Sequence, residues 1–147
     1  MSSTRVAIAE TVKDMLSAAS ALSTSVSVER VWNTQKSIND LKAFTVPLLT
    51  VVAVDQADER DSRSTFNEQY TIDVAIRKLI PDQDPATVDP LDLLGQDIAR
   101  LFRSHRLTNR SEVFAGSEYI TLVDTPQLNL LVFVGIVRLT FAKAGVA

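Results

Sequence analysis

The stretch Thr65–Ile80, TFNEQYTIDVAIRKLI, alternates apolar and polar residues along most of its length. This period of two predicts a β-strand with one buried face and one solvated face. The apolar stretch Leu128–Phe141 predicts a second long strand near the end of the chain. Strands of this length would extend about 50 Å, at about 3.3 Å per residue. A compact domain of this size is narrower, about 35 Å across.

Two interpretations of these long strands are open. In the first, bends or bulges break the strands inside one sheet, and Gly135 is a candidate position for such a break. In the second, the strand ends project beyond the core of the subunit and pair with a neighbouring subunit, because typical strands are much shorter than these.

Three shorter strands are predicted around the two long ones. Val26–Trp32 has the valines, tryptophan and alternating charges of a short strand. Leu48–Val54 follows Pro47 and is apolar on both faces, which predicts a central position in the sheet. A strand is also expected near Glu118–Val123, followed by a turn at Asp124–Pro126.

Two amphipathic helices complete the pattern. Thr4–Leu22 carries apolar residues at spacings of three and four. The pair Asp89-Pro90 predicts the start of the second helix, with Asp89 as N-cap and Pro90 in the first turn. We therefore expect one domain over residues 1–147 of the α+β class, in the order α-β-β-β-α-β-β. Its mainly antiparallel sheet would carry the two principal helices on one face.

Composition excludes several classes of protein. The chain has no cysteine, so it has no disulfide, thiolate nucleophile, zinc–cysteine site or iron–sulfur cluster. The net charge of −3 and a pI of about 5.1 argue against tight DNA binding by a basic surface, although DNA could slide past. The longest apolar run, Leu130–Val137, is far shorter than the roughly 18 residues of a membrane span. Charged residues interrupt the N-terminal apolar stripe, so no targeting segment is expected.

The sequence offers no catalytic signature. His105 is the single histidine, and no nucleophile or carboxylate motif accompanies it. The loop predicted at Asp55–Ser64 carries a cluster of carboxylates without the spacing or the glycine of a calcium loop. We expect this loop to protrude and to contact a partner, and we expect no metal, no cofactor and no enzymatic activity. The charged residues of the loop are Asp55, Asp58, Glu59, Arg60, Asp61 and Arg63.

Two groups of opposite charge flank the predicted second helix. The acidic set is Asp82, Asp84, Asp89 and Asp92, and the basic set is Arg100, Arg103, Arg106 and Arg110. Both sets suit the helix dipole, which favours acids at the start of a helix and bases at its end. Ion pairs with a neighbouring subunit and contacts with phosphate are the alternative interpretations of the basic set. Together with the charged loop, these residues are our candidate subunit or partner interface.

The order of several segments resembles a known family. A polar segment containing Ile38-Asn39-Asp40-Leu41 precedes Pro47–Val52, and a charged loop leads to Glu68–Ile76. The chain closes with the apolar strand Leu130–Phe141, which ends in Arg138-Leu139-Thr140-Phe141. This layout resembles the small neck and tail-completion proteins of tailed bacteriophages, especially tail terminators.

The resemblance implies a structural virion protein, made in the host cytoplasm, that forms a homo-oligomeric ring of six subunits. Such a ring caps the tail tube at its head-proximal end and provides the head–tail joining surface. Its partners would be the tail tube protein and a head-side connector or stopper protein. Genomic DNA would pass through without specific binding, and no membrane would be involved. Two alternatives are another neck ring protein, namely a head–tail adaptor or stopper, and a small-ligand binding α+β domain.

Overall fold

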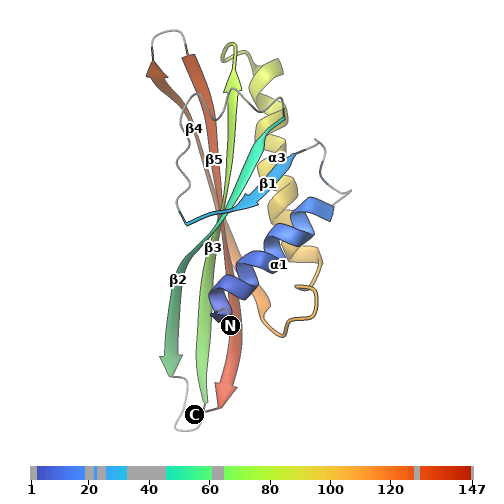
Figure 1. Ribbon diagram of the computed structural model, residues 1–147, viewed down its shortest axis with the longest axis vertical. Helices are drawn as coiled ribbons and strands as arrows, with labels where there is room; N and C mark the ends of the chain where they lie inside the picture. The colour runs from blue at the N-terminus through green and yellow to red at the C-terminus, as the bar shows by residue number, and fades with distance from the viewer. Residues whose placement is uncertain are drawn as a thin grey trace.

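In the described part of the chain, five strands and two helices follow one another in the order expected for an α+β fold (Figure 1). The computed structural model describes residues 3–18, 22, 26–32, 46–60, 65–127 and 130–146. The polar segment 33–45, part of the family resemblance, lies outside the described residues. The elements are α1 (Thr4–Ala18), β1 (Ser27–Arg30), β2 (Leu48–Arg60), β3 (Thr65–Ile80), α3 (Pro85–Ser104), β4 (Val113–Gln127) and β5 (Leu130–Val146).

The described strands form one sheet in the order β1-β2-β3-β5-β4. β1 is parallel to β2, and the remaining neighbours are antiparallel. β3 and β5 pair from Thr65↔Val146 to Ile80↔Leu131 without any register shift. Gly135 stands in regular register opposite Ile76, so it does not break the shared ladder. Pairing of the long strands between subunits stays a prediction.

The predicted ends of two strands were wrong, because each strand continues beyond its apolar residues. We predicted a loop at Asp55–Ser64, but β2 continues to Arg60 and pairs with β3 through Arg60↔Phe66. We predicted a turn at Asp124–Pro126, but β4 continues to Gln127, with a register irregularity between Asp124 and Gln127. Proline is tolerated at such irregularities of edge strands, and charged residues are tolerated where a strand leaves the core.

Helix α3 begins five residues earlier than predicted. Asp84, rather than Asp89, is the N-cap: its Oδ1 accepts a hydrogen bond from the Ala86 amide at 3.1 Å. The Thr87 hydroxyl donates to Asp82 Oδ1 at 2.8 Å and reinforces this start. Pro90 therefore lies inside the helix, where it is exposed and its missing amide costs one early hydrogen bond. Helix α1 is described over Thr4–Ala18, and Leu22, the predicted end, is not helical.

Both helices pack on the same face of the sheet, as predicted (Figure 1). Helix α1 packs against β1, β2 and β3, and α3 packs against β3, β4 and β5. We call this the covered face. Phe141 of β5 meets Phe102 and Phe114 edge to face, with ring centroids 6.1 and 6.3 Å apart. The fully buried side chains of this core include Ile8, Val12, Leu16, Leu49, Val51, Ile72, Val74, Ile76, Leu94, Ile98, Val137 and Leu139.

The opposite side of the sheet, which we call the second face, is partly apolar and partly charged. Leu48, Val132 and Val134 are buried in a small cluster there. Further along, the Arg138 guanidinium donates to both oxygens of Asp73, at 2.9 and 3.0 Å. Asp73 stands opposite Arg138 in the β3–β5 ladder, and Glu118 stands opposite Arg138 in the β4–β5 ladder. This cross-strand pairing holds the charges of three neighbouring strands in one row.

Two glycines make room for the ring of Tyr119 between α3 and the sheet. A Cβ placed on Gly95 would lie 2.1 Å from Tyr119 Cζ, and one on Gly135 would lie 3.1 Å from its Cε1. Gly135 is therefore a packing position and not a bend. The Tyr119 hydroxyl is buried without a hydrogen-bond partner in the described part of the chain. Burial raises the pKa of Tyr119, and the nearby Asp92 carboxylate raises it further, although Asp92 is not placed for a well-formed hydrogen bond.

We predict that Gly95→Ala lowers the free energy of unfolding by about 1–3 kcal/mol through overpacking against Tyr119. Alanine is normally about 1 kcal/mol better than glycine inside a helix, so a loss would be diagnostic of the clash. Gly116→Ala is the matched control, because nothing lies within 4 Å of the added methyl group. Urea unfolding measures both variants. In a Tyr119→Ala background Gly95→Ala should become neutral or stabilising; equal losses in both backgrounds would contradict the packing described.

Candidate functional site

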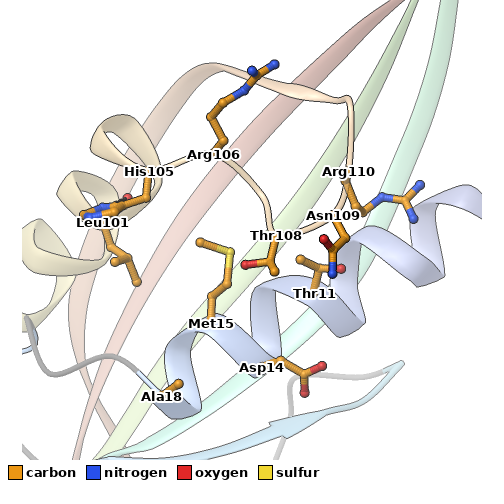
Figure 2. Close-up of a pocket in the computed structure, with 10 residues that line it drawn as sticks. All are labelled: Thr11, Asp14, Met15, Ala18, Leu101, His105, Arg106, Thr108, Asn109 and Arg110. Atoms are coloured by element: carbon orange, nitrogen blue, oxygen red, sulfur yellow. Dashed lines mark hydrogen bonds between the residues drawn. The ribbon is translucent and has the colours of Figure 1, made fainter.

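A groove of about 600 Å³ lies between α1 and the C-terminal end of α3 (Figure 2). The loop that follows α3 closes one side of it, and Asn109 turns this loop with a φ of 59°. Met15 projects from α1 into the groove (Figure 2). The groove contains the histidine that the sequence singled out, together with two of the predicted arginines, so it is the first place to look for chemistry. Its lining is Thr11, Asp14, Met15, Ala18, Leu101, His105, Arg106, Thr108, Asn109 and Arg110.

The ionisable side chains of this groove do not converge. Arg106 and Arg110 point in different directions, and Asp14 points away from both (Figure 2). The His105 ring is exposed, and its Nδ1 lies 3.2 Å from the Leu101 carbonyl oxygen, a contact that stays within one helical turn. A general base needs the group from which it takes a proton, or a water, within hydrogen-bonding reach. The geometry therefore gives no support to acid–base catalysis here.

Arg110 is committed to a contact inside the subunit. Its Nε and Nη2 donate to Glu112 Oε1 at 2.8 and 2.6 Å. The Glu112 side chain is only 2% exposed, and a buried carboxylate needs such a partner. Arg110 is thus a structural residue first, and its guanidinium is less available to a partner than the sequence suggested.

The other predicted arginines fall into two separate places. Arg100 and Arg103 are exposed and line a smaller groove of about 310 Å³ between α3 and β4, together with Ser117 and Tyr119. We call this the α3–β4 groove. Arg106 belongs to the groove beside α1 instead. The basic set is therefore not one patch.

The acidic residues start the same helix. Asp82 and Asp84 hold the first turn of α3 through the bonds described above, and Asp89 is exposed just beyond them. Since α3 has 20 residues, its acidic start and basic end lie about 30 Å apart at 1.5 Å per residue. The sequence placed these charges at opposite ends of one helix, and that separation is confirmed.

The predicted charged loop is largely strand. Asp55 is exposed within β2, directly after an irregularity in the β2–β3 ladder. Asp58, Glu59 and Arg60 follow in the same strand, but only their backbone is described. Asp61 and Arg63 lie outside the described residues. Contact between these residues and a partner stays a prediction.

A cluster that the sequence analysis missed lies beside β1. Trp32 is 61% exposed, and the Arg5 and Arg30 guanidinium carbons lie 5.6 and 5.7 Å from the centroid of its ring. Arg30 also forms an ion pair with Glu10 of α1. Tryptophan and arginine are enriched at the energetic centres of interfaces. This exposed tryptophan with two arginines is therefore a candidate contact site. The available signal was the sequence Glu29-Arg30-Val31-Trp32 at the end of a short strand.

The edge of the sheet opposite β1 is formed by β4. Among the described strands β4 pairs with β5 alone. Its Ile120 side chain is 62% exposed. Edge and central strands can both alternate polar and apolar residues. The edge position of β4 was therefore not predicted from the sequence.

Within the described ranges, no group of three or more His, Asp or Glu side chains could hold a metal ion. No described helix is long and apolar enough to cross a membrane.

A second tyrosine has a strongly raised pKa. Tyr70 is nearly fully buried, and its hydroxyl donates to Glu68 Oε2 at 2.6 Å. Burial raises the pKa of Tyr70 to about 12, and the Glu68 carboxylate contributes to the rise by accepting this hydrogen bond and by its charge. The folded state therefore favours the neutral phenol.

Because the folded pKa of Tyr70 is above its unfolded value of about 10, its contribution is present below pH 10 and is lost as the pH rises toward 12. We predict a fall in the free energy of unfolding of about 2–3 kcal/mol over this range from Tyr70. Tyr70→Phe should show a shallower fall, with the part due to Tyr119 retained. Urea unfolding at a series of alkaline pH values measures this. Identical slopes for the two proteins would refute the assignment.

Comparison of the sequence with protein-family models and with curated proteins finds no match. The function must therefore be inferred from the sites of the molecule itself.

Proposed function

We propose that the chain is a structural ring subunit of a phage neck, most specifically a tail terminator. The ring would sit at the head-proximal end of the tail tube and provide the head–tail joining surface. The observation that carries the proposal is that the two outermost of the described strands, β1 and β4, make dissimilar edges of one sheet. β1 has four residues and is accompanied by an exposed tryptophan, whereas β4 has fifteen residues and an exposed isoleucine.

Closed rings need two different complementary patches on each subunit, because each contact joins one patch to the other kind on the next subunit. A two-fold dimer needs only one patch that is complementary to itself. Two unlike edges at opposite sides of one sheet therefore suit a head-to-tail ring better than a two-fold dimer. The shape of the subunit, with strands along its longest axis (Figure 1), suits a wall of such a ring.

The charge of the chain suits a channel for DNA. With a net charge of −3, a hole lined by such subunits would offer few cations to phosphates, so DNA would pass without being held. The same argument applies to an adaptor or a stopper ring of the neck. The adaptor and the stopper ring are therefore alternative positions in the neck for the same proposed structural role.

A small-ligand binding domain is a second candidate, and the groove beside α1 favours it. Its volume of about 600 Å³ is in the range of ligand pockets. The divergent side chains there fit a binding role better than a catalytic one. Native mass spectrometry of the purified protein separates the candidates, because a stoichiometric small molecule would support the second candidate.

We predict that the purified protein assembles to a mass near six times the 16.1 kDa of one chain, and that a complex with tail tube protein contains the same six copies. Light scattering after size exclusion measures this mass. Electron microscopy of phage tails made with and without the protein tests the station. Tails made without it should vary in length and fail to join heads; uniform tails with intact head joining would show that the terminator assignment is wrong.

A further inference from the structure

The β4 edge lacks the usual protection of a free edge strand. From Gly116 to Asp124 it pairs with β5 without a register shift. These nine residues, GSEYITLVD, include no lysine, arginine or proline, although natural edge strands commonly use lysine, proline or bulges to prevent pairing with other chains. The irregularities of β4 lie at the two ends of this run, and the exposed Ile120 lies at its centre. Such a run is suited to accept another strand.

Among the described strands, β1 is the other outermost strand of the sheet, and it lies level with this part of β4. Following the ladder partners across the sheet, Ser27 is level with Leu122 and Arg30 is level with Tyr119. The strand directions also suit pairing between the two edges, because β4 runs antiparallel to β1. When two subunits stand side by side in the same orientation, β1 of one therefore meets β4 of the other as an antiparallel neighbour.

The faces of the two edges agree as well. Arg30 contacts α1, and Tyr119 packs against α3, so both lie on the covered face. Glu29 and Ile120 lie on the second face, because side chains alternate along a strand. An unshifted register places Ile120 opposite Glu29, and a shift by two residues places it opposite Val31. A shift by one residue would exchange the faces.

The helix layer places an exposed aromatic ring level with a groove. Trp32 follows Arg30 by two residues on the covered face, so it would reach the α3–β4 groove of the next subunit beside Ser117 and Tyr119. Arg100 and Arg103 are exposed there, and Trp32 brings the Arg5 and Arg30 guanidinium groups with it, so this contact would be made by the apolar indole ring and not by pairing of charges.

We propose that β4 of one subunit pairs antiparallel with β1 of the next copy of this chain, and that Trp32 of the second copy fills the α3–β4 groove of the first. The sheets of neighbouring subunits thus join into one continuous sheet around the ring. This inference rests on the proposed ring function and specifies its subunit contact. A register shift by an even number of residues at each junction keeps the faces aligned and gives the stagger that a closed sheet needs.

The chain has no native cysteine, so introduced cysteines report the contact without background. Two double variants test it: Ile120→Cys with Glu29→Cys, and Ile120→Cys with Val31→Cys. Within one subunit β1 and β4 are four strand spacings apart, about 19 Å, beyond the reach of a disulfide. After mild oxidation, at least one double variant should give a ladder of covalent oligomers up to ring size on a non-reducing gel. The single-cysteine variants should remain monomeric on the gel.

Each other outcome has a distinct meaning. A covalent dimer of Ile120→Cys alone would show that β4 pairs with β4, and it would overturn the proposal. A ring-sized mass in solution without cross-links in either double variant would also overturn it, but would leave the proposed ring function standing. A protein that stays monomeric at all concentrations, alone and with tail tube protein, would refute the ring function and this contact together.

Trp32 is the single tryptophan of the chain, so its fluorescence is a second readout. The emission should shift to shorter wavelength as the protein concentration rises and the ring forms, because the indole leaves water. Trp32→Ala should raise the concentration at half-assembly roughly tenfold or more. Val54→Ala, which removes an exposed apolar side chain of β2 and not of either outermost strand, is the matched control and should leave it unchanged. An unshifted emission on assembly would contradict the placement of Trp32.

Discussion

The unbroken ladder between β3 and β5 is the constraint on which the rest of the structure depends. Every residue from Thr65 to Ile80 has a partner in β5, so the alternation of side chains is fixed over the full length of both strands. That alternation sends Ile72, Val74 and Ile76 to the covered face. The helices pack where this apolar surface is continuous, and the sheet beyond their reach carries the charged end of β2.

The same ladder fixes the heights of the outer strands. β2 and β4 take their register from β3 and β5, and β1 takes its register from β2. The relative heights of the two outermost strands, β1 and β4, are thus set by the central strands between them. Local adjustments are confined to the outer ladders, where Ala115 in β4 and Val54 in β2 are the extra residues at irregularities that the central pair does not have. A Tyr119 ring seated between Gly95 and Gly135 joins the outer strand to α3 and to the centre.

Much of the fold could be predicted from local pattern. The alternation of Thr65–Ile80 predicted its strand, and the spacing of apolar residues predicted α1 and α3. The errors arose where the same local signal occurs twice in the sequence, or where the structure depends on contacts between distant residues. Asp84-Pro85 and Asp89-Pro90 are the same capping signal, and the hydrogen bonds of Asp82 and Thr87 favour the first. The charged residues Asp55–Arg60 form strand because β3 is beside them, which no local propensity records. Likewise, the partner of Arg110 and the edge position of β4 depend on contacts that only the folded chain creates.

The alignment of the strands with the longest axis of the subunit (Figure 1) also determines how the molecule bears mechanical load. Hydrogen bonds of an antiparallel ladder lie perpendicular to the strands. A pull along the axis, applied at opposite ends of β3 and β5, therefore shears all the bonds of their ladder at once instead of opening them one after another. The strands would have to slide past each other as a unit before they separate. A sheet built in this way resists stretching along its strands far better than peeling across them.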